Sequence, residues 1–264
     1  DDNGGTDRGA IHIMFMDTDG SIDSATVEIN SASSPGPSII DGDFFGASIT
    51  NIGDLDNDGV DDLAVGARDD DDGGTDRGAV HIMYMNTDGS IDSTVEINSA
   101  TSNGPVLSDA DGLGNAIANI GDLNNDGVND IAVAANKDDA GGDLRGTIHI
   151  MFMNTNGSID STVEINSSTS NGPTLSDGDR FGASIVNMGD LNNDGVTDIA
   201  VGANSDDGTS TDRGAIHIMF LNTDGSVDST IEINDSTTNG PTLADSDLFA
   251  GSISNMGDLN NDGV

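Results

Sequence analysis

The stretch GDLDNDGVDDLAVGA occupies residues 53–67 and joins an acidic, glycine-containing loop to a short apolar run. It returns as GDLNNDGVNDIAVAA at residues 121–135 and as GDLNNDGVTDIAVGA at residues 189–203. A shortened form, GDLNNDGV, occupies residues 257–264, so the copies are spaced by 68 residues. A fixed period of this length is typical of repeat architectures, in which each unit packs against its neighbours.

A second marker, DRG or a close variant, follows the same repeat. Its copies are separated by 69, 68 and 68 residues, at Arg8, Arg77, Arg145 and Arg213. The repeat divides the chain into four units, residues 1–69, 70–137, 138–205 and a truncated 206–264. Because the sequence starts and stops inside acidic loops, we expect one continuous array that is part of a longer chain or an assembly.

Each repeat predicts four short strands separated by turn-forming residues. The first strand follows a Phe-Gly pair such as Phe181-Gly182, and the second has the sequence DIAVGA or a variant. The third is GAIHIMFM and the fourth SIDSTVEIN, or close variants. The connecting segments NDG, DDGG, NTDGS and SNGP contain the residues that favour tight turns.

The polarity of these strands indicates how they pack. The third strand is apolar on both faces, with Ile11 and Ile13 alternating with Met14 and Met16, which suits a strand between neighbouring sheets. The fourth strand alternates and carries acids, as an outer strand does. Four strands per unit at a fixed period predict an all-β fold of β-propeller blades, each a four-stranded antiparallel sheet.

The composition excludes several classes of function. Lys and Arg number 7 against 48 Asp and Glu, a net charge of −41, so neither a nucleic acid nor an anionic membrane is an expected partner. No apolar run approaches the roughly 18 residues of a membrane helix, and cysteine is absent. No G-x-S-x-G, H-E-x-x-H or phosphate-binding glycine loop occurs, so we expect a protein that is not an enzyme.

The quoted stretches share the pattern D-x-[DN]-x-D-G-V-x-D, which predicts a calcium loop. Alternate side chains of a tight loop point inward, so the oxygens of positions 1, 3, 5 and 9 converge, and position 7 can offer its backbone carbonyl. Ca²⁺ takes about 6–8 oxygen ligands, so we expect about one ion per repeat. The predicted ligands are Asp54, Asp56, Asp58, Val60, Asp62, Asp122, Asn124, Asp126, Val128, Asp130, Asp190, Asn192, Asp194, Val196, Asp198, Asp258, Asn260, Asp262 and Val264.

Two other interpretations of this loop fit the sequence less well. The loop is not an EF-hand, because the twelfth residues are Val65, Val133 and Val201 instead of Glu. A bare hairpin turn would also use Asp and Asn for local backbone bonds. Three complete copies with acids at positions 1, 5 and 9 favour the ion, since clustered carboxylates repel one another without a cation.

With these motifs in place, the chain resembles the FG-GAP repeat family, the blades of integrin α-subunit propellers and of bacterial surface proteins. Phe45-Gly46 and Phe181-Gly182 match its first element, whereas Leu113-Gly114 and Phe249-Ala250 depart from it. The second element lacks its proline in every copy, at Gly66-Ala67-Arg68, Ala134-Ala135-Asn136 and Gly202-Ala203-Asn204.

The resemblance implies a non-catalytic, extracellular or cell-surface β-propeller with one calcium per blade. Because the copies are nearly identical, we expect a calcium-stabilised structural repeat protein of an extracellular fibre or stalk, whose partners are neighbouring repeats. The alternative is an integrin-like adhesion module that binds a glycan or a host or matrix protein. A unique exposed aromatic or arginine cluster in one loop would favour that alternative, and Phe44 and Arg180 are the departures between copies that could supply it. A hydrolase fused to the blades would need catalytic residues outside this segment.

Several weaker signals carry two interpretations each. One histidine per repeat either contributes to a metal ring or forms one local hydrogen bond in the third strand, at His12, His81, His149 and His217. The arginine of each DRG is expected to pair with the acidic loop before it, or else to recognise a ligand.

Three further polar features lie in predicted loops. The acids before each first strand are expected to be solvated or to complete a cation shell, at Asp41/Asp43, Asp109/Asp111, Asp177/Asp179 and Asp245/Asp247. The NTDGS segment favours a simple hairpin turn, and the alternative interpretation is a second cation site. Glycosylation sequons occur at Asn156, Asn166 and Asn234, where ordinary turn residues are the alternative.

Overall fold

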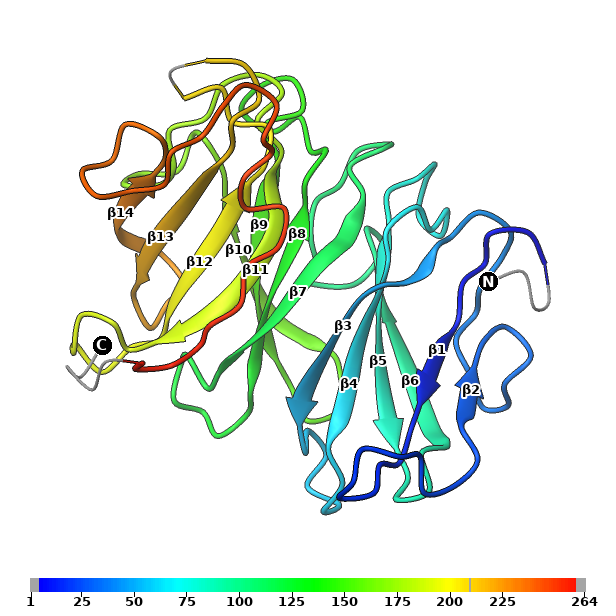
Figure 1. Ribbon diagram of the computed structural model, residues 1–264. Coiled ribbons are helices and arrows are strands. Elements are labelled where there is room, and N and C mark those ends of the chain that lie inside the picture. Colours follow the sequence, from blue (N-terminus) through cyan, green and yellow to red (C-terminus); the bar gives the residue numbers. More distant parts are fainter. Residues whose placement is uncertain (1–4, 209, 260–264) are drawn as a thin grey trace.

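The computed structural model describes residues 5–208 and 210–259 and is built from β-strands (Figure 1). The described residues contain no helix long and apolar enough to cross a membrane. A two-stranded antiparallel pair comes first, formed by β1 (Ile11–Ile13) and β2 (Val27–Ile29). Three four-stranded sheets follow, and the fold is therefore all-β, as predicted.

Each four-stranded sheet is an antiparallel meander in chain order. The first sheet contains β3 (Phe45–Gly53), β4 (Asp62–Ala67), β5 (Ala79–Met85) and β6 (Ile91–Ile97). The second contains β7 (Leu113–Gly121), β8 (Asp130–Ala135), β9 (Thr147–Met153) and β10 (Ile159–Ile165). The third contains β11 (Phe181–Gly189), β12 (Asp198–Ala203), β13 (Ala215–Leu221) and β14 (Val227–Ile233).

The sheets recur with the same 68-residue period as the sequence repeats, but they start at a different point of the repeat from the predicted units. The four strands of one sheet are divided between two of the predicted units, so that β3 and β4 lie in residues 1–69 whereas β5 and β6 lie in residues 70–137. The β1–β2 pair corresponds to the third and fourth strands of a blade, as the sequence predicted.

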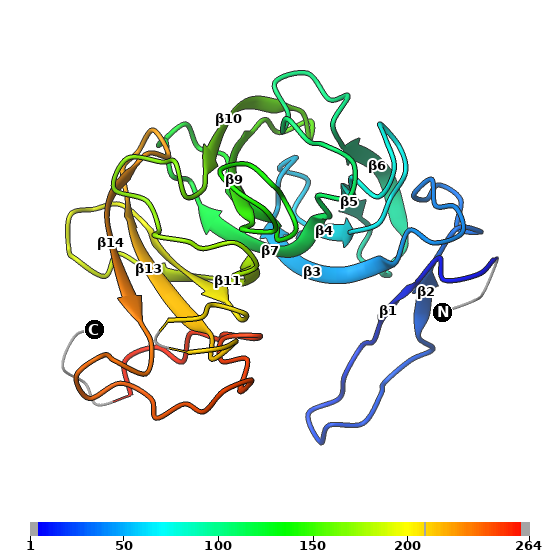
Figure 2. The ribbon, with the colours of Figure 1, turned by 90° about the horizontal axis from the view of Figure 1, so that it is seen from above.

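The sheets are arranged as propeller blades around a common axis (Figure 2). The first strands β3, β7 and β11 lie innermost, and β6 and β10 lie toward the outside. An asparagine ladder joins the inner strands. The Asn119 amide donates to the Asn51 carbonyl at 3.1 Å, and the Asn187 amide donates to the Asn119 carbonyl at 3.0 Å. The Asn255 amide continues the series to the Asn187 carbonyl at 3.1 Å.

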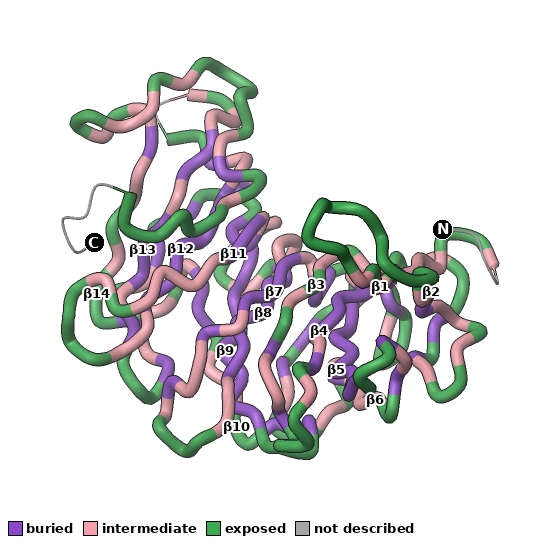
Figure 3. The backbone as a smooth tube through the Cα atoms, turned by 60° about the horizontal axis from the view of Figure 1, so that its bottom comes forward, coloured by how far each residue is buried: buried purple, intermediate pink, exposed green. Residues whose placement is uncertain are grey.

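The hydrophobic cores lie between blades, not within one sheet. Figure 3 shows that the buried residues are concentrated along the strands. One cluster joins the first and second sheets, and another joins the second and third. The third strands β5 and β9 are buried along their whole length, as expected for strands covered on both faces. The first copy differs, because Met14 and Met16 remain 52% and 58% exposed.

One predicted strand is absent from the described residues. Residues 249–257 repeat the first-strand sequence but form no strand. In the complete sheets this strand pairs with the second strand of its own blade, and no such partner is described here. The segment still follows β11, since the Ser184 hydroxyl donates to the Ala250 carbonyl at 2.8 Å.

Candidate metal centre

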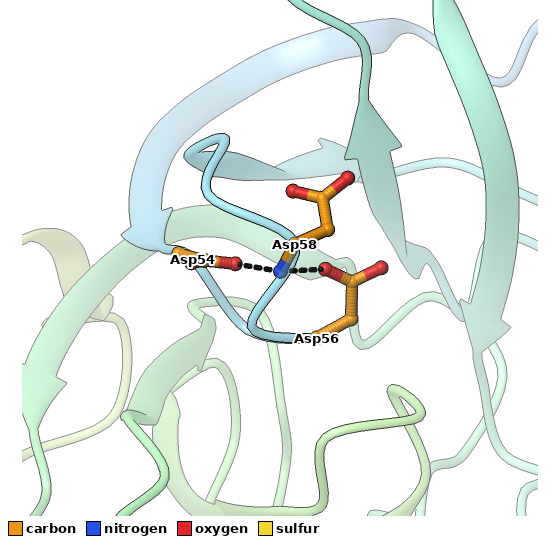
Figure 4. Close-up of side chains that lie close together, drawn as sticks. All are labelled: Asp54, Asp56 and Asp58. Atoms are coloured by element: carbon orange, nitrogen blue, oxygen red, sulfur yellow. Dashed lines mark hydrogen bonds between the residues drawn. The ribbon is translucent and has the colours of Figure 1, made fainter.

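The predicted calcium loop of the first sheet connects β3 to β4. Oxygens of Asp54, Asp56 and Asp58 lie within 4.8 Å of one another. Figure 4 shows these three side chains around the loop. All three side chains are exposed. The structure therefore brings positions 1, 3 and 5 of the motif together, as the alternation of side chains predicted.

Backbone hydrogen bonds fix the shape of this loop. The Asp54 carboxylate accepts the N–H groups of Asp58 and Gly59, each at 2.9 Å. Asp56 also accepts from the Asp58 N–H, at 3.1 Å (Figure 4). Asn57 and Gly59 have positive φ values of 63° and 95°, which asparagine and glycine adopt most readily. The sequence DLDNDG, residues 54–59, thus supplies both the acceptors and the residues that allow the turn.

The ninth-position acid, Asp62, has a different environment. Its side chain is 1% exposed, and its carboxylate accepts the N–H of Leu55 at 2.9 Å and of Met85 at 3.0 Å. Burial raises the pKa of Asp62, and the two backbone bonds oppose that rise. Asp62 lies outside the group of three and ties the loop to β5, so its role as a ligand stays a prediction.

The second and third loops repeat this geometry with an asparagine at position 3. Asp122 accepts the N–H groups of Asp126 and Gly127 at 2.9 Å, as Asp54 does in the first loop. The Asn124 amide donates to the Asp126 carboxylate at 2.8 Å, and Asn192 donates to Asp194 at 2.7 Å. An asparagine binds a cation through its side-chain oxygen, not through its amide nitrogen. The equivalent ninth-position acid, Asp130, is buried, and its pKa is raised to about 6.

The donor set of these loops fits a hard divalent cation. Three carboxylates converge at the first loop, and among the described residues no arginine or lysine forms an ion pair with them. The seventh-position side chains Val60, Val128 and Val196 pack against the hydrophobic clusters. Their side chains therefore anchor the loop, and only their carbonyls are available as predicted ligands.

The fourth loop is described only in part. Asp258 lies in the described chain, and the predicted ligands Asn260, Asp262 and Val264 lie outside the described residues.

The repeated arginines form ion pairs, but not with the loop predicted. Arg77 Nε lies 2.8 Å from Asp109 Oδ1, and the equivalent pairs are Arg8–Asp41, Arg145–Asp177 and Arg213–Asp245. The partner is the first acid before the next first strand, which the propeller brings beside the arginine. These first acids remain 59–62% exposed, as the sequence predicted, but each also pairs with an arginine, which it did not predict.

The second acid of the first three pairs is buried, whereas Asp247 of the fourth pair is exposed. Asp43, Asp111 and Asp179 are 2–3% exposed, and each accepts a backbone N–H three residues earlier. Burial raises their pKa values to about 6.

The histidines lie in third strands, as predicted, but the expected hydrogen bond is missing at two of them. Both ring nitrogens of His149 and of His217 are buried without a hydrogen-bond partner. His81 and His217 instead contact the edges of Phe45 and Phe181, with ring centroids 5.5 Å apart. Burial lowers the pKa of His149 to about 4. The four histidines belong to four different sheets and do not form a ring around one metal.

The remaining loop predictions concern the hairpin tips and the sequons. The NTDGS segment is a simple turn, in which the Asn86 N–H donates to the Ser90 carbonyl at 2.8 Å and Asp88 accepts the Ser90 N–H at 3.0 Å. Of the sequon asparagines, Asn156 is exposed, whereas Asn166 and Asn234 are buried and donate to neighbouring glutamates.

Comparison with known proteins agrees with this geometry. Residues 45–83 and 181–219 match the FG-GAP repeat family. The chain contains FG-GAP repeats. Both matches begin at a Phe-Gly pair and extend from the first strand into the third, and no match covers the second sheet, which begins with Leu113-Gly114.

The FG-GAP chain is also similar to integrin α subunits. It is 34% identical over 170 residues to integrin alpha-4 of Xenopus laevis and 35% identical over 165 residues to human integrin alpha-11. Each alignment covers 61% of this chain but only 14% and 13% of the relatives. The chain is thus an integrin-like β-propeller segment that spans about one seventh of those proteins.

Phe44 departs from the other copies in the sequence, but its contact with Arg68 is evident only in the structure. The guanidinium carbon of Arg68 lies 5.2 Å from the centre of the Phe44 ring. The later copies have Asn136 and Asn204 at the arginine position. A column-by-column comparison of the repeats would have shown both substitutions.

Proposed function

We propose that this chain is a calcium-stabilised propeller segment of a cell-surface protein, and that it binds an extracellular protein or glycan. The observation that carries the proposal is the pair formed by Phe44 and Arg68. An exposed aromatic or arginine cluster that occurs in one copy alone distinguishes a ligand-binding propeller from a uniform structural array. Phe44 and Arg68 come from two loops that meet at one end of the first sheet.

The pair has the properties of a recognition surface. Phe44 is 39% exposed and has a φ of 53°, which is strained for an aromatic residue. Its ring and Arg68 line a cavity of about 240 Å³ together with Asp7 and Ala47. An arginine over an aromatic ring offers both an apolar face and charged donors, a combination enriched at binding hot spots.

The position of the pair also separates recognition from calcium binding. Phe44 precedes β3 and Arg68 follows β4, whereas the calcium loop joins the other ends of these two strands. Calcium has a structural role in this proposal: it neutralises the clustered carboxylates and couples loop folding to the ion. The similarity to integrin α subunits supports a role in adhesion.

The test is a binding screen with matched variants in excess calcium. The chain is applied to a glycan array and to a panel of matrix proteins. Phe44→Gly and Arg68→Asn restore the residues of the second copy, Gly112 and Asn136. We expect each variant to lose most binding and to keep its circular dichroism spectrum.

Val106→Ser is the control, because this residue is 83% exposed and lies far along the chain from the pair. Binding that survives in Phe44→Gly/Arg68→Asn, or no binding by the wild type to any surface, would contradict the proposal.

A structural fibre is the second candidate function. The near-identity of the repeats favours it, since identical units stack through identical interfaces. Electron microscopy of calcium-loaded native material distinguishes the two. Continuous fibres with a repeat of a few blades would support the structural array, and separate particles would count against it.

A further inference from the structure

A second acidic cluster lies at the other end of β4 from the calcium loop of the first sheet. Oxygens of Asp70, Asp72 and Glu96 lie within 4.8 Å of one another. Asp70 and Asp72 belong to the loop after β4, and Glu96 lies in β6. The β4 strand has six residues, so about 17 Å separates this cluster from the calcium loop.

A buried histidine faces Asp70 of this cluster. His81 is 1% exposed, and its Nε2 atom has no hydrogen-bond partner and lies 3.9 Å from Asp70 Oδ2. His81 and Glu96 are directly opposed on β5 and β6, so their side chains lie on the same face of the sheet. The lone pair of a neutral imidazole is thus available beside the Asp70 carboxylate, one of the three acids of the cluster.

The cluster lacks a compensating cation in the described chain. Nearby Arg77 pairs with Asp109, and Lys137 pairs with Asp69 instead of Asp70. A fourth acid adds to the charge, because Asp43 is 2% exposed and its Oδ1 has no hydrogen-bond partner. Burial, followed by repulsion from Asp43 and Glu96, raises the pKa of Asp70 to about 7.

We propose that Asp70, Asp72, Glu96 and His81 bind a divalent metal ion of the Zn²⁺ or Mn²⁺ class. These ions accept imidazole nitrogen together with carboxylate oxygen, whereas Ca²⁺ takes oxygen ligands. Bonds of about 2.1 Å hold two ligand atoms up to about 4.2 Å apart, and His81 and Asp70 already lie within that span. The ion would tie the loop after β4 to β5 and β6, at the rim opposite the calcium loops.

The other two sheets provide natural controls. They retain the histidine, the first acid and the glutamate, at His149, Asp138 and Glu164 and at His217, Asp206 and Glu232. The position of Asp72 is occupied by Ala140 in the second sheet and by Gly208 in the third. The full set of four ligands therefore occurs in the first sheet alone among the three complete sheets.

The experiment is a calorimetric titration of the whole chain with ZnCl₂ in excess CaCl₂, which keeps the calcium loops saturated. We expect one strong zinc site in the wild type. Asp72→Ala converts the loop to its Ala140 counterpart at an exposed position and should weaken that site at least about tenfold. Ala140→Asp should add a second site.

Asp92→Ala is the matched control, since it removes an exposed acid from β6 away from the cluster. Equal zinc affinity in the wild type and in Asp72→Ala, or an equal loss in Asp92→Ala, would overturn the proposal. A parallel titration with MnCl₂ determines which ion binds more tightly. X-ray absorption of the zinc complex should show the outer-shell signature of one imidazole, and its absence would remove His81 from the site.

Discussion

At the scale of single residues, the environment of each aspartate decides what it contributes. Asp54 is exposed, accepts two backbone N–H groups and faces two other carboxylates, so it suits a cation. Asp179 is 2% exposed and its Oδ1 has no hydrogen-bond partner, so its negative charge destabilises the folded state. Net charge alone does not distinguish these two roles.

Asp179→Asn should therefore stabilise the chain at neutral pH. Burial, together with repulsion from Asp206 and Asp207, raises the pKa of Asp179 from 3.8 to about 6. The folded state binds the proton more tightly than the unfolded state, so Asp179 costs most stability above pH 6 and nothing below pH 3.8. We expect the variant to be about 1–3 kcal/mol more stable at pH 8 and equal to wild type near pH 4.

Chemical denaturation across this pH range, at constant calcium, measures the effect. Asp177→Asn is the control, because Asp177 pairs with Arg145 at 2.8 Å and its loss should slightly destabilise the chain. A constant difference between wild type and Asp179→Asn at every pH would contradict the argument.

At the scale of elements, the hairpin between a first and a second strand is the unit on which the proposed calcium ion would act. In the second sheet, Asp122 and Asp126 shape the loop between β7 and β8, and Asp130 connects it to β9 through the Met153 N–H. An ion bound to the exposed carboxylates would hold three strands at one rim. Local stability should then depend on calcium in each sheet separately.

Asp126→Ala should destabilise its own sheet and leave the distant ones nearly unchanged. The variant loses the acceptor of the Val128 N–H at 2.9 Å, worth about 1 kcal/mol, and also a calcium ligand. Hydrogen exchange should accelerate in β8 and not in β4 of the first sheet. The difference in unfolding free energy between wild type and variant should grow when calcium is added, because only the intact loop is stabilised by binding the ion. If wild type and variant differ in unfolding free energy by the same amount in chelator and in calcium, the loop between β7 and β8 binds no ion.

The strands and the loop could be predicted from the sequence because their signals are local. The Phe-Gly pair, the alternating acids and the doubly apolar third strand each occupy fewer than ten residues. Contacts between repeats could not be predicted in the same way. The partner of Arg77 is Asp109, 32 residues away, and the acid beside His81 comes from the loop after a different strand. Asp62 is buried because β5 packs over the loop, and no local sequence pattern indicates that contact.

At the scale of the whole molecule, the asparagine ladder links blades that are 68 residues apart in the chain. Each of these asparagines also accepts a backbone N–H two residues later, as Asn119 does from Gly121 at 2.9 Å. One asparagine side chain therefore accepts a hydrogen bond within its own strand and donates another to the preceding blade. Hydrophobic clusters on either side of the second sheet complete the connection.

Asn119→Asp tests the ladder alone. Aspartate keeps the acceptor for Gly121 but places a carboxylate oxygen against the Asn51 carbonyl, which should cost about 1–3 kcal/mol of unfolding free energy. Asn222→Asp is the control, since the first copy has Asp17 at the same hairpin position. Thermal unfolding in excess calcium compares the two. Equal melting temperatures for both variants would show that the ladder contributes nothing to blade association.

The ladder also has an evolutionary consequence. Asn119 donates to the preceding blade and its carbonyl accepts from the following one, so the two sides of a unit complement each other. Unequal recombination between such similar repeats would insert or remove a whole blade, and the new neighbours would already have complementary hydrogen-bonding groups. No compensating mutation would be needed, and lineages could differ in blade number while every junction stayed the same.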